Sequence, residues 1–421
     1  MKTLAKIKVM PEEDAALMEK GILCKLLFEI TTTKQDVVEK KTKHDILALL
    51  ELMREHLPEK LHKWLHFCAT SYDIINTAYA FQAKVFFEEA FIPEIKALDE
   101  LWREKIRANA NVIQLGRTHL QTALPVTVGF WLTSSHNRFI KNSRKALILA
   151  GEIPGCFSGA VGTFASQRIF LKSEKGEKVL MKMLGLSAAE VSTQITPPEG
   201  MARFYYELVL ISAAIANLGE DVRKLQAPEY GEVKSYGSTS STMSHKDSNP
   251  ILAEKIAGML VSVIAENSKI TMTLVSDFQR DLRWSNVMRG YSAVAVYTFE
   301  QILTAKRLLE SIEINDEGCR NNFQERGKLV TAEALHLFLQ REGIPDAHQL
   351  VNKKIVPTAR EKGINLYEAT QLLVGSEEHL TDEITGKIMY DESGIIKYLL
   401  SSEKYLGDAV KIAKREAENK L

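Results

Sequence analysis

The sequence predicts an all-α protein built around a bundle of long helices, and two segments carry the prediction. Over residues 251–265, apolar side chains recur at three- and four-residue steps, which is the spacing of one buried helical face. Residues 204–225 repeat this spacing. Both segments contain helix-favouring Ala, Leu, Glu and Lys and no Pro, a composition that favours long helices joined by loops.

Turn-rich segments divide the helices in order along the chain. Residues 151–162, 196–200 and 230–250 are predicted breaks, because Gly, Pro and small polar residues gather there. The polar segment 315–327 is predicted to be another break before a run of shorter helices. We therefore expect an N-terminal helical domain at 1–78, a central helical bundle at 79–312 and a C-terminal helical domain at 313–421.

The composition limits the classes of partner. The 54 basic and 54 acidic residues balance, so the charge points to neither a nucleic acid nor a membrane surface. No apolar run reaches the roughly 20 residues that a membrane helix needs, and the first residues do not form a secretory signal. The four cysteines are scattered without ligand spacing, so we expect a cytoplasmic protein with free thiols, no metal site and no cofactor.

The segment 235–250 has the strongest chemical signal. Gly237 and the five small hydroxyl residues 238–242 compete with helical hydrogen bonding and predict a loop. Lys246 and Asn249 follow, just before the proline that suits the first turn of the next helix. A serine nucleophile or base beside a cation, an amide and a helix N-terminus suits an anionic substrate. A flexible serine-rich linker is the alternative interpretation.

Three histidine clusters lie elsewhere in the predicted helical chain. His44 opens a helical segment between a lysine and an aspartate. His66 lies close to Thr70 and Ser71. His119 lies with other polar residues between an apolar stretch and a proline. A single such histidine is more often structural than catalytic, but three clusters and the loop together indicate a site.

These clusters resemble the signature segments of the fumarase/aspartase superfamily, and more narrowly its adenylosuccinate lyase branch. The segment K-W-L-H-F-C-A-T-S-Y-D-I-I-N-T-A at 63–78 resembles the W-x-H-x-G-x-T-S-x-D-x-x-D-T-A of that branch. G-R-T-H-L-Q-T-A-L-P at 116–125 and S-S-T-M-S-H-K-D-S-N-P at 240–250 are similar to two further motifs. Q-R-D-L-R-W-S-N-V-M-R at 279–289 resembles the segment that contacts the nucleotide phosphate. The motifs follow the order of the superfamily, and the resemblance extends from about residue 41 to the end.

The resemblance implies a three-domain fumarase/aspartase-type subunit with a central long-helix bundle. It also implies a homotetramer in which each active site is shared between three subunits, and a small-molecule anionic substrate. The implied reaction is β-elimination across a C–N bond of a succinyl adduct, which releases fumarate. The expected substrates are adenylosuccinate, which gives AMP, and the succinylated carboxamide ribotide of purine synthesis.

The resemblance also implies a role for each site residue. Ser240 corresponds to the base, and His119 to the acid that protonates the leaving nitrogen. Lys246 and Asn249 correspond to the residues that hold the carboxylate on which charge builds up. The remaining expected substrate-binding residues are His66, Thr70 and Ser71 for the fumaryl part, Gln194 for positioning, His44, Arg280, Ser285 and Arg289 for the nucleotide and its phosphate, and Thr118 and Ser241 as further contacts.

Several positions depart from the branch pattern. Ser244 replaces a proline, and an extra residue separates Lys246 from Asn249. Asn76 replaces the second aspartate of its motif, and Pro198 stands where the branch has an arginine. The Arg-Tyr pair of nucleotide-using members is absent from the first 29 residues. Two alternatives therefore stay open, which are a carboxymuconate-type cycloisomerase acting on a smaller polyanion and a helical assembly protein that has lost catalysis.

Overall fold

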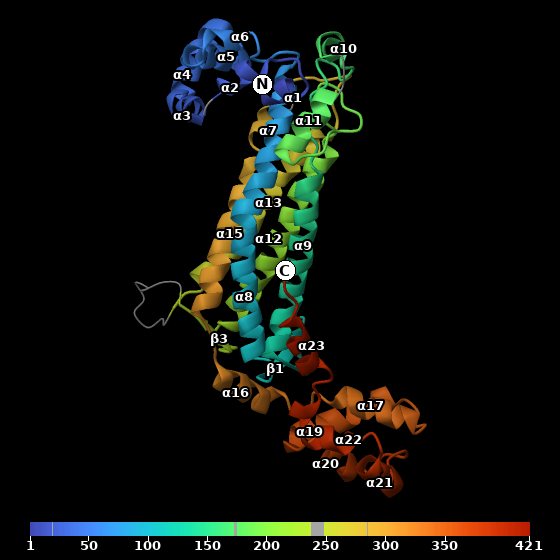
Figure 1. Ribbon diagram of the computed structural model, residues 1–421. Helices are drawn as coiled ribbons and strands as arrows, with labels where there is room; N and C mark the ends of the chain where they lie inside the picture. The colour runs from blue at the N-terminus through green and yellow to red at the C-terminus, as the bar shows by residue number, and fades with distance from the viewer. Residues whose placement is uncertain (19, 172–174, 237–247, 284) are drawn as a thin grey trace. The chain divides into compact units, whose positions relative to one another are not determined.

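Helices make up most of the regular structure in the computed structural model, which confirms the all-α prediction (Figure 1). It describes residues 1–18, 20–171, 175–236, 248–283 and 285–421. The predictions for Ser240, Ser241 and Lys246 lie outside these described residues. The chain forms two compact units, the first from Met1–Pro93, Ser143–Val209 and Ser262–Val296, and the second from Glu94–Asn142, Leu210–Val261 and Tyr297–Leu421.

The first unit holds the N-terminal helices and the segments that follow two of the predicted breaks. Its own elements are α1 (Lys2–Lys6), α2 (Glu12–Ala16), α3 (Lys20–Glu29), α4 (Thr32–Thr42), α5 (Asp45–His56), α6 (Glu59–His62), α7 (Ser71–Phe86), η1 (Phe87–Phe91), α10 (Ala165–Phe170), α11 (Lys175–Leu184), η2 (Met272–Leu274) and α14 (Ser285–Arg289). Its core includes Phe87, which stacks on Phe91 and meets the ring of Phe204 edge-on, with both centroid distances 5.5 Å.

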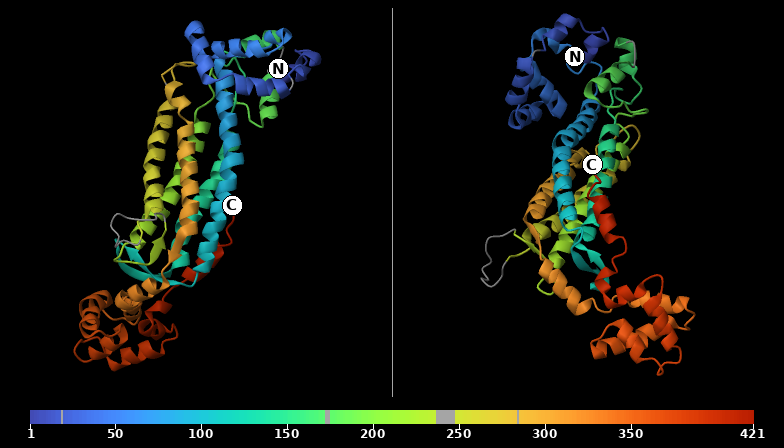
Figure 2. Two further views of the ribbon diagram at one scale, coloured as in Figure 1. Left: turned by 90° about the vertical axis from the view of Figure 1, so that its left-hand side faces the viewer. Right: turned by 60° about the horizontal axis from the view of Figure 1, so that its bottom comes forward.

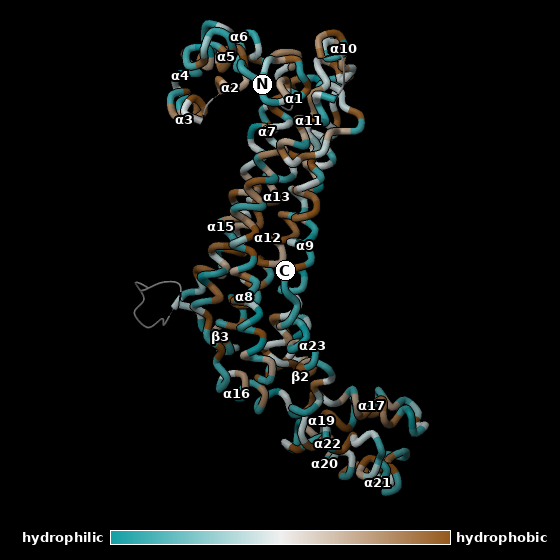
Figure 3. Tube along the Cα trace, in the orientation of Figure 1, coloured by the Kyte–Doolittle hydropathy of each residue, from teal (hydrophilic) through white to brown (hydrophobic). Residues whose placement is uncertain are grey.

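The residues of four long helices are divided between the two units. These helices are α9 (Val128–Glu152), α12 (Glu199–Leu225), α13 (Ile251–Thr271) and α15 (Ser292–Ser311). The segments predicted to be helical at 204–225 and 251–265 lie within α12 and α13, so both predictions are confirmed. Figure 3 shows hydrophobic and hydrophilic positions alternating along the long helices, as helices with one buried face require.

The bundle part of the second unit packs α8 (Ile92–Ala108) with segments of the four long helices, which run side by side in both views of Figure 2. Apolar residues of α8 recur at helical spacing, and Trp102 stacks on Phe139 of α9 at 5.7 Å. Gly219 of α12 allows a close approach to α13, since a Cβ there would lie 2.6 Å from the Ala253 carbonyl oxygen. Gln301 of α15 donates to the Ile256 carbonyl oxygen at 2.6 Å.

Two antiparallel strand pairs also belong to the second unit. They are β1 (Ile113–Thr118) with β2 (Gln121–Thr127), and β3 (Val233–Ser235) with β4 (Ile312–Ile314). The shorter helices that follow are α16 (Asp316–Arg326), α17 (Ala332–Arg341), α18 (Ala347–Leu350), η3 (Val351–Ile355), α19 (Val356–Lys362), α20 (Leu366–Leu372), α21 (Asp382–Tyr390), α22 (Ile395–Leu400), η4 (Ser402–Lys404) and α23 (Ala409–Glu416). Helices α17 to α22 share one apolar cluster that includes Leu335, Ile355 and Leu399.

The predicted break at 315–327 is wrong, because α16 occupies most of that segment. The Asn315 side chain caps this helix by accepting from the Gly318 N–H at 3.2 Å. Cys319 and Asn322 are buried, so contacts with the rest of the second unit stabilise a helix whose composition is polar.

One described helix, α12, is long and apolar enough by length and composition to cross a membrane. However, 56% of its apolar window is buried inside the protein, and the core helix of a soluble protein passes the same test.

Candidate active site

Four residues of the first unit form a connected polar cluster around Arg280. The Arg280 guanidinium lies over the ring of Tyr72, 3.4 Å from its centroid, which is a cation–π contact. Arg280 Nη1 donates to Gln194 Oε1 at 2.7 Å. The Tyr72 hydroxyl shares a 3.3 Å hydrogen bond with Ser285 Oγ. The structure thus brings together three of the predicted substrate-binding residues, which are Gln194, Arg280 and Ser285.

Three of these residues, Tyr72, Arg280 and Ser285, line a small pocket within the first unit. The walls are mainly apolar or aromatic, as in many small-molecule sites. Among the described residues, no carboxylate forms an ion pair with Arg280, and its buried Nε has no hydrogen-bond partner. An arginine held in this way is available to an anion. The lining residues include Tyr72, Asn76, Tyr79, Thr196, Pro197, Pro198, Arg280, Ser285 and Tyr291.

Gln194 is fixed by its neighbours. Its Nε2 donates to the Ala160 carbonyl oxygen at 2.9 Å, and its backbone N–H donates to the Gln279 carbonyl oxygen at 3.3 Å. With Nε2 engaged, the amide presents Oε1 to Arg280. Gln194 therefore orients the guanidinium.

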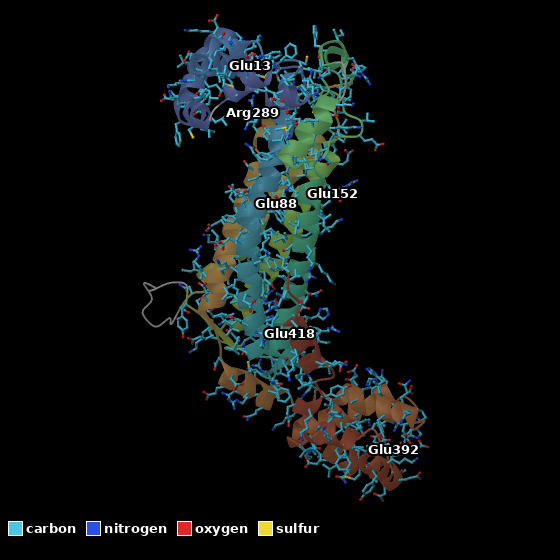
Figure 4. The ribbon with its side chains drawn as sticks, in the orientation of Figure 1. Glu13, Glu88, Glu152, Arg289, Glu392 and Glu418 are labelled. Atoms are coloured by element: carbon cyan, nitrogen blue, oxygen red, sulfur yellow. The ribbon has the colours of Figure 1, made fainter. Side chains whose placement is uncertain are left out.

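The predicted residues His44 and Arg289 are linked through Asp45. His44 is the N-cap of α5, and its Nδ1 accepts from the Ile46 N–H at 3.2 Å, so the prediction that His44 opens a helix is confirmed. Arg289, labelled in Figure 4, ends α14, and its Nη2 lies 3.4 Å from Asp45 Oδ2. The Arg289 side chain is 67% exposed, so this ion pair is weak and can exchange for another anion.

His66 lies near the start of α7 in a strained conformation. Its φ is 57°, in the left-handed region, and its buried Nε2 has no partner among the described residues. Burial lowers its pKa, and repulsion from His44 adds to that effect, while Asp73 opposes it. The imidazole is therefore neutral near pH 7. Strain and an unpartnered polar atom together are typical of a functional position.

Thr70 and Ser71 are held at the start of α7 by Asp73. Thr70 and Asp73 form a reciprocal capping box, in which the Thr70 N–H donates to Asp73 Oδ2 at 2.8 Å. Asp73 Oδ1 also accepts from the Ser158 N–H at 2.9 Å. This buried carboxylate ties the His66 region to the loop after α9.

Thr118 and His119 belong to the second unit, at the turn between β1 and β2. Thr118 pairs with Gln121, so His119 and Leu120 form a two-residue turn. Their φ angles are 52° and 62°, which are the left-handed values of a type I′ turn. Such turns favour Asn and Gly, so His119 and Leu120 occupy strained positions. Thr118, His119 and Leu120 are all exposed, as a residue that meets a substrate must be.

A buried anchor fixes this hairpin. The fully buried Glu232 accepts two hydrogen bonds from Arg117, at 3.0 and 2.5 Å. Glu232 also accepts from Gln114 at 2.8 Å and from Asn322 at 2.8 Å. Arg117 lies over the ring of Tyr230 at 4.6 Å. Arg117 is therefore a structural residue that positions the strand leading to His119.

Asn249 is half-buried just before α13, where its carbonyl oxygen accepts from the Ile251 N–H at 2.8 Å. It lines a pocket of the second unit together with Arg223 and Gln226. No hydrogen bond joins His119 to Asn249 within the part of the chain that the structure describes. The helix predicted to start at residue 251 does start there, as α13.

Three residues of this site were not among the predicted site residues. Tyr72 and Asp73 were visible in the T-S-Y-D motif but were not selected, and Asn76 was noted only as a departure. Tyr72 carries the Arg280 contact and Asp73 the capping box. In the described ranges there is no group of three or more His, Cys, Asp or Glu residues that could hold a metal ion.

Solved structures share this fold over nearly the whole chain. A fumarate lyase from Mesorhizobium sp. BNC1 aligns with a TM-score of 0.76 at 22% identity and covers 100% of this chain and 92% of its own. A 3-carboxy-cis,cis-muconate lactonizing enzyme from Pseudomonas putida aligns with a TM-score of 0.79 at 21% identity and covers 99% and 90%. The chain therefore shares the fold of these two enzymes.

Proteins of similar sequence identify the class of enzyme more narrowly. The family described as Lyase matches residues 2–265. An adenylosuccinate lyase of Archaeoglobus fulgidus is 30% identical over 97% of this chain and 88% of that enzyme. An adenylosuccinate lyase of Bacillus subtilis is 27% identical over 92% and 87%. The chain belongs to this lyase family, and it is a C–N lyase of the fumarate lyase type.

Proposed function

We propose that this enzyme cleaves adenylosuccinate to AMP and fumarate, and that it cleaves the succinylated carboxamide ribotide in the same way. The supporting observation is the Arg280 cluster, in which Gln194 and Tyr72 hold a guanidinium that has no carboxylate partner among the described residues. An arginine prepared in this way suits a phosphate, because its planar donors match phosphate oxygens. Ser285 adds a hydroxyl beside it.

Arg289 is proposed to complete the phosphate contact. Its ion pair with Asp45 is exposed and weak, so a phosphate carrying nearly two negative charges competes well for the guanidinium. His44, next to Asp45, then faces the same end of the nucleotide. The pocket within the first unit would hold the nucleotide end of the substrate.

The elimination is proposed to start at Ser240. The serine alkoxide removes a proton from the carbon next to a carboxylate, and Lys246 and Asn249 stabilise the charge that builds up there. The electron pair then forms the carbon–carbon double bond of fumarate as the C–N bond breaks. His119 donates a proton to the departing nitrogen, a contribution of about 10²–10⁴-fold.

A serine base needs help because its ordinary pKa is far above neutral. Lys246 supplies a positive charge, and the N-terminus of the 21-residue α13 adds a favourable dipole. The proposed fumaryl contacts complete the site. They are His66, Thr70 and Ser71, and Thr118 and Ser241 are proposed as further substrate contacts.

The assembly is proposed to be a homotetramer with shared active sites. Large apolar side chains are exposed on α13 and α15, including Val261 at 71% and Val296 at 56%. Exposed apolar surface of this kind is typical of subunit contacts. Light scattering of the purified protein measures the mass, and a monomer would contradict this part of the proposal.

A carboxymuconate-type cycloisomerase is the second candidate. One observation favours it, because Pro197 and Pro198 line the pocket where the branch pattern has an arginine. A smaller polyanion lacking phosphate needs fewer cations.

Ultraviolet absorbance separates the candidates. Loss of adenylosuccinate absorbance with release of fumarate supports the proposal, and succinyladenosine, which lacks phosphate, should react much more slowly. Turnover of 3-carboxymuconate without turnover of adenylosuccinate would favour the second candidate. The absence of turnover with either substrate would overturn both substrate assignments.

A further inference from the structure

Asn76 places a buried acceptor without a donor in the wall of the Arg280 pocket. The side chain lies on α7 and is 5% exposed. Its Nδ2 donates to Thr196 Oγ1 at 3.1 Å, which fixes the plane of the amide. Its Oδ1 accepts no hydrogen bond from any residue that the structure describes. Burying an amide oxygen in this state is costly, so a position that retains it calls for a partner from outside the chain.

The surroundings of Asn76 identify the kind of partner. Asn76 lies one helical turn after Tyr72, on the same face of α7, and Tyr72 carries the Arg280 guanidinium. An aspartate at position 76 would place a negative charge in the pocket that contains Arg280. Asparagine keeps the acceptor without adding charge, and the carboxylate among the lining residues, Asp281, is paired with Arg283 at 2.7 Å, so Arg280 is left to an anionic ligand. The partner of Oδ1 is thus a neutral donor, a hydroxyl or an N–H, carried by an anionic molecule.

We infer that Asn76 is a specificity-determining residue whose Oδ1 accepts a hydrogen bond from a ribose hydroxyl of the nucleotide. The inference rests on the proposed function, because Arg280 and Ser285 then hold the phosphate, and the ribose is the next group along the nucleotide. Thr196 is the positioning residue that keeps Oδ1 directed at the hydroxyl. A carboxymuconate has no hydroxyl to offer, so this contact also separates the two candidate substrates.

The test compares substrates that differ only in the ribose. Wild-type enzyme and the Asn76→Leu variant are assayed with adenylosuccinate and with its 2′-deoxy and 3′-deoxy analogues. Wild-type kcat/KM should fall roughly 5- to 30-fold for one of the analogues, the effect of losing one hydrogen bond. Asn76→Leu should lose the same factor with adenylosuccinate and show no further loss with that analogue.

Two further variants support the test. The first replaces Asn76→Leu if that variant does not fold, and the second is a control. Asn76→Asp retains the acceptor, so it should still discriminate between the ribose and deoxyribose substrates, while its KM for both rises because the carboxylate attracts Arg280. Asn321→Leu, a matched change at an exposed position of α16, should behave as wild type.

Equal wild-type activity on the ribose and both deoxyribose substrates overturns the inference about Asn76. Equal losses for all three substrates in Asn76→Leu also overturn it, because the residue would then be structural. Failure of the proposed function has a different signature, namely wild-type enzyme that cleaves none of the three, and the inference then fails with it.

Discussion

The imidazole of His136 lies 2.8 Å from the carboxylate of Glu416, joining α9 to α23 inside the second unit. Its other nitrogen lies 2.9 Å from Asp99 Oδ1 on α8. Asp99 also accepts from Arg103 Nε at 3.2 Å. His136 is fully buried and the two carboxylates are nearly so, so α23 is fastened to the bundle by charged groups shielded from water.

Stability should therefore depend on pH through His136. Burial lowers the His136 pKa, but hydrogen bonds to Asp99 and Glu416 outweigh it, and the pKa is raised above 6.5. A raised pKa means that the stabilisation is complete below about pH 6.5 and is lost as pH rises through the folded-state value. Urea unfolding between about pH 6 and pH 9 should show this decline, and His136→Gln should flatten it.

At acidic pH, stability should change in the opposite direction and fall as the pH falls. Burial raises the pKa values of Asp99 and Glu416, but His136 and their other partners outweigh it and lower them below 3.8 and 4.5. Their contribution is present above those values and is lost as pH falls through the lowered ones. If the free energy of unfolding fell equally in wild type and His136→Gln as the pH rose above about 6.5, His136 would not be the source of the pH dependence.

Replacing Glu232 with Gln should destabilise the hairpin that carries His119. The change leaves Arg117 without its buried countercharge, and breaking such a pair costs about 3–5 kcal/mol. Chemical unfolding measures the loss. The matched control is Glu310→Gln, an exposed position on α15, where the change should stay within about 0.5 kcal/mol. Similar losses in both variants would contradict the role of Glu232 as an anchor.

Ser240→Ala should lower turnover of adenylosuccinate by several orders of magnitude, because the proton has no acceptor. Circular dichroism and light scattering should match wild type. Ser238→Ala, a serine of the same segment outside the proposed machinery, serves as the matched control and should stay near wild type. Near-normal turnover in Ser240→Ala would remove that serine from the mechanism.

His119→Gln should reduce kcat with little change in KM, the pattern of an interaction made mainly in the transition state. Glutamine keeps hydrogen bonding but cannot donate a proton near neutral pH, so a loss of about 10²–10⁴-fold is expected. The pH–rate profile should also lose one limb. An unchanged profile would assign the acid to another residue.

Arg289→Met should raise the KM for adenylosuccinate and scarcely change the reaction of succinyladenosine, which has no phosphate. The reason is the loss of a charge-assisted contact to phosphate. Arg320→Met, a matched change at an exposed position of α16, serves as the control and should have little effect on either substrate. If Arg289→Met affected both substrates equally, Arg289 would not be a phosphate-binding residue.

The long helices could be predicted from sequence because their signal is local. The apolar spacing at 204–225 and 251–265 reports one buried face, whatever packs against it. Helix α16 escaped prediction because its composition is polar and its stability comes from elsewhere. Asn322 donates to Glu232, 90 positions earlier, and no periodicity in 315–327 reveals that bond.

Site residues could be predicted from the sequence only where they belong to a motif that resembles the superfamily. Gln194, Arg280 and Ser285 were identified by resemblance, and the structure joins them through Tyr72. The contact between Tyr72 and Ser285 spans 213 positions, so sequence spacing cannot anticipate it. The orphan oxygen of Asn76 is a property of packing, which becomes visible only when every neighbour is in place.

The turn at His119 and Leu120 bears on how far the stability of the enzyme can be improved. Asn-Gly at these two positions would make a more stable turn, since glycine and asparagine relieve the left-handed strain. A histidine at a position that favours asparagine or glycine costs stability, which fits the proposed role of His119 as a proton donor. Leu120→Gly should therefore increase the stability of the enzyme, because it relieves the strain at the second turn position and leaves the His119 imidazole in place.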